Sequence, residues 1–228
     1  YAAVATYGFS GVPLFFIMGS FLSRSGYVTD LFTMARLWVG NIPGGLVHAT
    51  IVAGSVFGAA SGSGIACTTI LANVCVPEMR KGGVDNVLAV GTVASVGPID
   101  QMIPPSILMV IYCIITGTSL GKLLIAGILP GILLALSFMI LTYLRVKRKP
   151  ALAPLLEEKV SWEERFKSLK HIWRICILAI LVLGGIYTGV FTPVEAGAIG
   201  AFGSFVLSVS TKRQRRSELA AALLDAAR

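Results

Sequence analysis

Apolar residues follow one another along this chain in blocks long enough to cross a membrane, with groups of basic residues between them. A helix needs about 20 apolar residues to cross the roughly 30 Å of hydrocarbon in a bilayer. Residues 1–23 carry no charge, and residues 123–144 form a second block that ends at a basic cluster. Two further blocks, 175–194 and 196–211, meet at Pro193 and are expected to pair as antiparallel spans.

The middle of the chain departs from this simple pattern. The uncharged segment 37–77 is interrupted at its centre by Ser61-Gly62-Ser63-Gly64. The apolar runs on either side, 51–60 and 65–76, are too short to cross a bilayer. Two short helices joined by a Gly/Ser tip predict a re-entrant hairpin over 44–77. Such a hairpin enters and leaves the membrane on the same face. The alternative, two short complete spans with a polar turn outside the membrane, is disfavoured by the arm lengths.

A second interruption follows within residues 84–118. The stretch 97–106 contains Pro98, Pro104 and Pro105, and proline removes a backbone donor and clashes with the preceding helical turn. A broken transmembrane helix is therefore predicted here. Non-helical backbone is tolerated at membrane depth only where it lines a cavity or is buried in protein. The hairpin tip and the helix break are both expected near the membrane midplane.

Composition supports the membrane interpretation. The 228 residues are 55% hydrophobic and only 13% charged, whereas an ordinary soluble domain carries about 25% charged residues. This excludes disorder, a collagen-like chain, a disulfide scaffold and a conventional cytosolic enzyme. The chain also lacks G-x-S-x-G, H-E-x-x-H and Walker A motifs, so no enzymatic activity is expected. We predict an all-α integral membrane protein, a polytopic helix bundle containing the hairpin and the broken helix.

The net charge of +8 is concentrated in loops. Nine basic residues lie in 145–174 and four in 212–216, and the positive-inside rule makes both loops cytoplasmic. No aromatic or Gly-Arg pattern accompanies the charge, so a nucleic-acid partner is not expected. Residues 150–173 have aromatic residues at helical spacing and predict a cytoplasmic amphipathic linker on the membrane surface. Residues 28–39 predict a short amphipathic arm.

The two interruptions carry the candidate chemistry. Discontinuous helices in secondary transporters direct half-helix N-termini at anionic substrate groups, while unwound carbonyls and helix C-termini coordinate Na⁺. Ser61 and Ser63 add neutral hydroxyl oxygens, and Gly62 and Gly64 allow a tight turn. The backbone over 97–105 is expected to supply carbonyl ligands.

Asp100 is an ionisable group expected at membrane depth, which makes it a candidate functional residue. It could bind a cation or carry a proton, and a carboxylate that caps a half-helix or pairs within the bundle is an equally open interpretation. Glu195 is expected to cap a helix start near the outer interface.

Several short stretches, spread over nearly the whole chain in the same order, resemble the large membrane subunit of TRAP (tripartite ATP-independent periplasmic) transporters. They are Val12-Pro13-Leu14-Phe15, Met18-Gly19, Gly44-Gly45-Leu46, residues 57–63, Ile103-Pro104-Pro105-Ser106, Tyr112, Pro130-Gly131, and residues 189–196.

The resemblance implies an ion-transporter-superfamily fold with inverted repeats that moves by an elevator-type mechanism. Residues 1–149 would be the first repeat and 174–228 the start of the second, and the chain is expected to be a piece of a longer permease. The implied function is import of an organic acid, such as a C4-dicarboxylate or sialic acid, across the bacterial inner membrane. Na⁺ is the implied coupling ion, with no other cofactor. The implied partners are a small membrane subunit, a periplasmic substrate-binding protein and the lipid bilayer.

By the same resemblance, the hairpin tip and the helix break form the first-repeat cation and substrate site. The candidate residues are Ser61, Gly62, Ser63, Gly97, Pro98, Asp100, Pro104, Pro105 and Ser106, with Ser61, Ser63, Gly97 and Asp100 as candidate Na⁺ ligands. The chain departs from the family pattern at two positions. Cys67 stands where an Asp is common, and Asp100 stands where a small residue is usual. We hypothesise that Asp100 adjusts cation binding.

Two other functions remain open from the sequence. One is a stand-alone ion-coupled carboxylate carrier that uses no binding protein. The other is a non-transporting membrane scaffold subunit, which has no need of breaks at the midplane.

Overall fold

The computed structural model describes residues 11–155 and 160–210, and these residues fold as helices joined by short loops. The all-α prediction is confirmed for them. The helices are α1 (Gly11–Arg24), α2 (Tyr27–Val39), α3 (Gly45–Ser61), α4 (Gly64–Lys81), α5 (Asn86–Met102), α6 (Ile107–Thr116), α7 (Leu120–Arg148), the 3₁₀ turn η2 (Pro150–Leu152), α8 (Trp162–Tyr187) and α9 (Pro193–Ser210).

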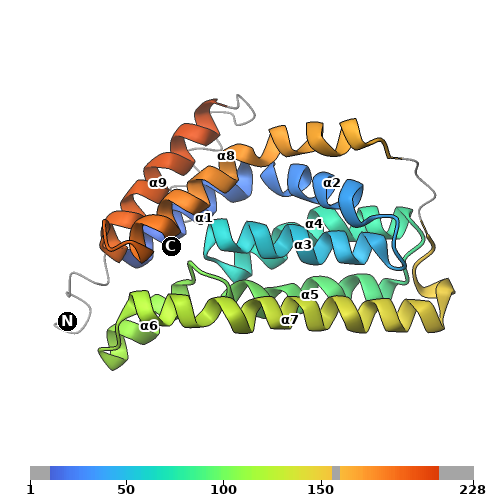
Figure 1. The fold of residues 1–228 in the computed structure, drawn as a ribbon, viewed down its shortest axis with the longest axis horizontal. Helices are drawn as coiled ribbons and strands as arrows, with labels where there is room; N and C mark the ends of the chain where they lie inside the picture. Colours follow the sequence, from blue (N-terminus) through green and yellow to red (C-terminus); the bar gives the residue numbers. More distant parts are fainter. Residues whose placement is uncertain (1–10, 156–159, 211–228) are drawn as a thin grey trace.

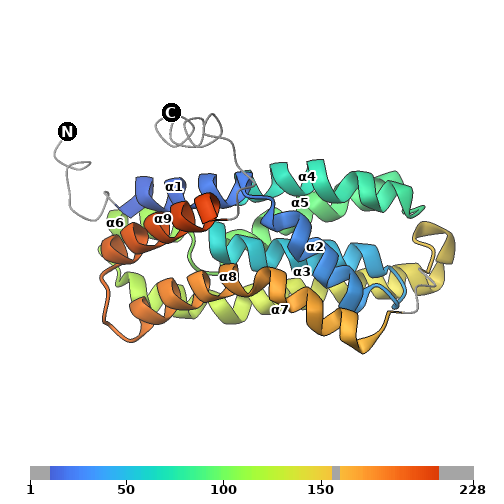
Figure 2. The same ribbon diagram turned by 90° about the horizontal axis from the view of Figure 1, so that it is seen from above.

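Four helices, α3, α4, α5 and α7, run side by side along the long axis of the molecule (Figures 1 and 2). The end of α4, the start of α5 and the end of α7 lie together at one end, which we call the basic end (Figure 1). Its basic residues are Arg80, Lys81, Arg145, Lys147 and Arg148. The helices α1, α6 and α9 gather toward the opposite end.

Two of the described helices, α7 and α9, are long and apolar enough to cross a membrane. Two bent pairs also qualify: α5 with α6, bent by 43°, and the two parts of α8, bent by 54°. The predicted span 123–144 falls within α7. Most of the predicted span 1–23 is α1, and its first ten residues, like the basic group 212–216, lie outside the described residues.

The hairpin arms are longer than the sequence indicated. Helices α3 and α4 have 17 and 18 residues, which at 1.5 Å per residue is about 26 Å each. The arms are longer than the apolar runs because α3 already begins at Gly45 and includes His48 and Thr50. In the same way, α4 continues through the polar residues Glu78, Arg80 and Lys81 at the basic end. The predicted linker 150–173 is also not separate from the span that follows, since α8 continues through its end as one bent helix.

An unpredicted contact joins the first and last helices that the structure describes. Helix α1 packs along α9 (Figure 1), where a Cβ atom at Gly197 would lie 3.2 Å from Leu14. The rings of Phe21 and Phe205 meet edge to face at 5.4 Å. The segment expected to begin the second repeat is therefore anchored on the first helix of the first.

Candidate substrate and cation site

The hairpin turns in two residues. Helix α3 ends at Ser61, and Gly62 adopts a left-handed conformation with φ +68° while its N–H donates to Gly58 O at 2.8 Å. A residue with a Cβ is strained at this φ, so the turn depends on glycine. Ser63 then caps α4, its hydroxyl accepting from Ala66 N at 3.5 Å. Both serines are buried.

The helix break is shorter than predicted. Helix α5 continues through Gly97, Pro98 and Asp100 to Met102, so only residues 103–106 are non-helical. Pro98 lies on the exposed face of α5, where loss of one backbone hydrogen bond does not end the helix. The prediction of unwound backbone over 97–102 is therefore wrong. The break itself carries Pro104 and Pro105, joined by a cis peptide bond.

The tip and the break touch each other near the middle of the molecule (Figure 1). Ile107 N, at the start of α6, donates to Gly62 O at 3.2 Å. A Cβ at Gly62 would lie 3.0 Å from Pro105 O, and one at Gly64 would overlap the Gln101 amide. Ser106 in turn donates its hydroxyl to Gln101 Oε1 at 3.3 Å. Two features predicted separately thus form one buried unit.

Helix α1 packs against the buried unit formed by the hairpin tip and the helix break, a contact that the sequence did not predict. A Cβ at Gly19 would lie 2.8 Å from Ser61 O, so the two backbones are in close contact. Beside the tip, a cavity of about 430 Å³ opens between α1 and α4, with Ser20 and Arg24 on one wall and Ser63 and Ile65 on the other. The signal available in the sequence was Met18-Gly19, one of the family-like stretches.

Asp100 is buried, with 1% of its surface exposed. It lies against α3, where a Cβ at Gly58 would overlap its carboxylate, and beside the Cys67 thiol of α4. Cys67 Sγ donates to Gly54 O at 3.7 Å. Among the described residues, neither carboxylate oxygen has a hydrogen-bond partner, so Asp100 caps no helix there. The interpretation as a helix cap is therefore not supported, whereas pairing within the bundle, for which the Cys67 thiol is the neighbouring group, stays a prediction.

The two positions at which the resemblance implies a departure from the family pattern lie next to each other. Cys67 on α4 and Asp100 on α5 face each other across the contact between those helices. Within the described residues, no three His, Cys, Asp or Glu side chains form a metal cluster.

Glu195 is placed as predicted, at the start of α9. Its Oε2 accepts from Thr192 N at 2.7 Å and from Thr192 Oγ1 at 2.8 Å. The carboxylate is exposed at a helix start, far along the chain from the tip and the break, and its bonds are those of a cap.

Residues 1–228 match the family described as the tripartite ATP-independent periplasmic transporter, DctM component. The chain is 37% identical to the C4-dicarboxylate TRAP transporter large permease protein DctM of Pseudomonas aeruginosa, covering 96% of this chain and 51% of that protein. It is 33% identical to the sialic acid TRAP transporter large permease protein SiaM of Vibrio cholerae (83% and 44% covered).

A third relative is the ectoine TRAP transporter large permease protein TeaC of Halomonas elongata, 36% identical over 82% of this chain and 43% of that protein. The chain spans about half the length of the curated relatives it matches. With its hairpin, its broken helix and a family match that covers its whole length, the chain belongs to the DctM family of TRAP transporter permease components.

Proposed function

We propose that this chain forms part of a secondary active permease that imports an organic acid, coupled to the Na⁺ gradient by an elevator-type movement. One observation carries the proposal: the hydrogen bond from Ile107 N to Gly62 O, 3.2 Å long, which joins the hairpin tip to the helix break. This contact brings four helix ends together, the C-termini of α3 and α5 and the N-termini of α4 and α6.

The charges at these four helix ends explain how a single site can bind both an anion and a cation. Each helix N-terminus carries about half a positive charge and each C-terminus about half a negative charge. The starts of α4 and α6 favour a substrate carboxylate, while the ends of α3 and α5 favour Na⁺. The buried hydroxyls of Ser61, Ser63 and Ser106 add uncharged oxygen ligands.

Asp100 adds a carboxylate close to this cluster. It packs on Gly58, one helical turn before Ser61. An ionised carboxylate without a partner is costly to bury, and a bound cation would offset that cost. We therefore propose that Asp100 adjusts the affinity of this site for a cation.

The substrate class and the partners are carried over from the relatives. Transporters for C4-dicarboxylate, sialic acid and ectoine match the chain at 33–37% identity, so a small substrate that bears a carboxylate is proposed. A periplasmic binding protein would deliver it, and a small membrane subunit would support the permease. The proposed location is the bacterial inner membrane with the basic end on the cytoplasmic side.

The test is uptake of radiolabelled organic acids into proteoliposomes. These contain the full-length permease, its small membrane subunit and its binding protein, with and without an inward Na⁺ gradient. Ser61→Ala removes a hydroxyl at the tip. Ser55→Ala is the matched control, because Ser55 lies two turns earlier on the same helix and its hydroxyl only donates to Ile51 O at 2.8 Å. Ser63 is not chosen, since its loss would also remove the cap of α4.

Uptake that needs the gradient and the binding protein, falls at least about ten-fold in Ser61→Ala, and is retained in Ser55→Ala would support the proposal. Uptake without the binding protein would overturn the tripartite arrangement in favour of a stand-alone carrier. No uptake of C4-dicarboxylates, sialic acid or ectoine would favour the scaffold function.

A further inference from the structure

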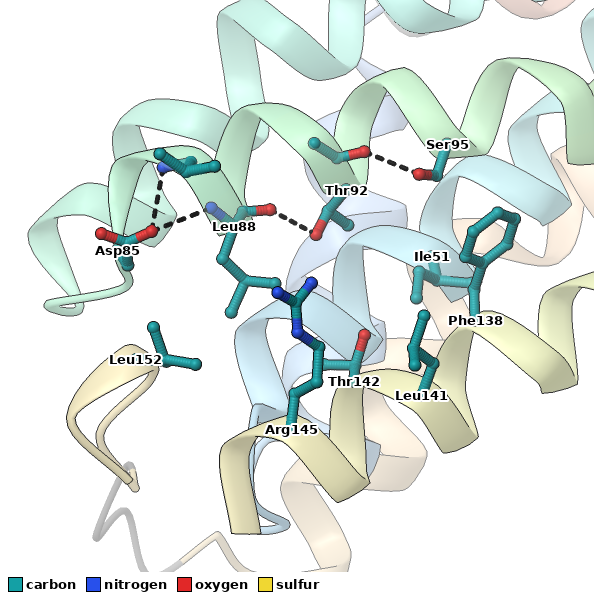
Figure 3. Close-up of a pocket in the computed structure, with 12 residues that line it drawn as sticks. Ile51, Asp85, Leu88, Thr92, Ser95, Phe138, Leu141, Thr142, Arg145 and Leu152 are labelled. Atoms are coloured by element: carbon teal, nitrogen blue, oxygen red, sulfur yellow. Dashed lines mark hydrogen bonds between the residues drawn. The ribbon is translucent and has the colours of Figure 1, made fainter. Parts of the chain in front are cut away.

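A second cavity lies at the basic end, away from the hairpin tip. It has a volume of about 260 Å³ and is enclosed by α3, α5, α7 and η2 (Figure 3). Much of its wall is apolar, with Ile51, Leu88, Phe138 and Leu152 among the lining residues. The proposed transport chemistry makes no use of this cavity.

Two opposite charges line the cavity without neutralising each other. Arg145, in the last turn of α7, extends toward α5 (Figure 3), and it forms no ion pair with any residue the structure describes. Asp85 caps α5, its Oδ1 accepting from Val87 N at 3.0 Å and Leu88 N at 3.1 Å. A cation and an anion held apart in one cavity are suited to a ligand that carries both charges.

Two hydroxyls of α5, further along the helix than Asp85, also line the cavity and act as acceptors (Figure 3). Thr92 donates its hydroxyl to Leu88 O at 2.7 Å, and Ser95 donates to Gly91 O at 2.7 Å. Because the hydroxyl hydrogens are used within α5, only oxygen lone pairs remain for a ligand. The α5 side of the cavity therefore favours a group with N–H donors.

The position of the cavity along α7 indicates a ligand with an apolar part. Arg145 follows the long apolar stretch of α7 directly, and basic residues at the end of a membrane helix are expected at the level of the headgroups. Apolar side chains beside the cavity are exposed, including Val87 and Val90 on α5 and Leu141 and Leu144 on α7. A headgroup in the cavity would thus have room for its hydrocarbon chains along both helices.

We infer that this cavity binds a phospholipid with a phosphoethanolamine headgroup. The phosphate would bind the Arg145 guanidinium, the ammonium would donate to Asp85, and the acyl chains would cover the exposed faces of α5 and α7. A choline headgroup offers no N–H donor, and a glycerol headgroup has no positive charge. Of these three headgroups, ethanolamine is therefore the one that suits both Arg145 and Asp85.

The test is native mass spectrometry of the purified full-length permease, titrated with phosphatidylethanolamine, phosphatidylcholine or phosphatidylglycerol of the same acyl chains. Arg145→Gln removes the cation from the cavity. Arg148→Gln is the matched control, because Arg148 ends the same helix but does not line the cavity. Asp85→Asn removes the negative charge and keeps the helix cap, since asparagine caps as well as aspartate.

We expect phosphatidylethanolamine to bind about ten-fold more tightly than the other two lipids, and Arg145→Gln to weaken it by at least a similar factor. Arg148→Gln should bind as the unmodified protein does, and Asp85→Asn should lose the preference over phosphatidylcholine. Equal binding of the three lipids, or unchanged binding in Arg145→Gln, would overturn the inference. Displacement of the lipid by water-soluble phosphoethanolamine at equal concentration would overturn it too, by making the site one for a free zwitterion.

Discussion

Replacement of Gly58 by alanine tests the packing of the buried carboxylate directly. Gly58 lies in α3, and a Cβ there would overlap the Asp100 side chain, with the Asp100 Cβ itself only 2.9 Å away. The helices cannot separate freely at this point, because Gly54, one turn earlier, is in similarly close contact with Val96 and Leu71. Alanine at position 58 must therefore push the carboxylate out of its place.

The size of the effect follows from two opposing contributions. Alanine in a helix interior is more favourable than glycine by about 0.5–1 kcal/mol. Overpacking a tight interior costs about 1–3 kcal/mol, so Gly58→Ala should lower the free energy of unfolding. Asp100→Gly removes the carboxylate and its Cβ, and in that background Gly58→Ala should instead raise the free energy of unfolding by about 0.5–1 kcal/mol. The sign of the effect is expected to reverse.

The assay is equilibrium unfolding of the full-length permease in mixed micelles, with the four proteins of the double-mutant cycle measured side by side. Gly91→Ala on α5 is the control, because a Cβ at Gly91 has nothing within 4 Å, and it should stabilise both backgrounds equally. If Gly58→Ala changed the stability of both backgrounds equally, within about 0.5 kcal/mol, the placement of Asp100 against α3 would be refuted.

Three further substitutions test other parts of the fold. Gly19→Ala should destabilise the protein by about 1–3 kcal/mol, because its Cβ would lie 2.8 Å from the Ser61 carbonyl oxygen; unchanged unfolding would disprove the contact of α1 with the hairpin. Ser161→Ala removes the cap of α8 and should lower the free energy of unfolding by about 1 kcal/mol in the same assay. Glu195→Ala removes the bonds to Thr192 and should lower the unfolding midpoint while leaving the Na⁺ dependence of uptake unchanged. A changed Na⁺ dependence would give Glu195 a direct role in coupling.

The hairpin tip and the helix break could be predicted because their residues act locally. Gly62 permits a left-handed turn wherever it occurs, and Ser63 caps the helix that follows it. Pro104 and Pro105 interrupt a helix by steric clash alone. These effects depend on neighbours in the sequence, so both features were visible in the sequence before any packing was known.

The extent of each helix was harder to predict, because it depends on tertiary surroundings. Pro98 was expected to mark the break, yet α5 passes through it on an exposed face and ends at Met102. The polar end of α4 was expected to lie beyond the hairpin, yet the helix continues to Lys81. Proline and charge limit a helix only where the surroundings cannot accept them, and a linear sequence does not reveal those surroundings.

Contacts between individual side chains on different helices could not be predicted, and Asp100 shows what they add. From the sequence, Asp100 was an extra carboxylate on α5, and Cys67 was an unrelated loss of one on α4. In the structure the two side chains face each other beside Gly58. A carboxylate from either helix would reach the same small space, one turn from Ser61, and Gly58 with the compact Cys67 provides the room that Asp100 needs. The place of this carboxylate is thus set by the packing of three helices and not by the residues next to Asp100 in the sequence.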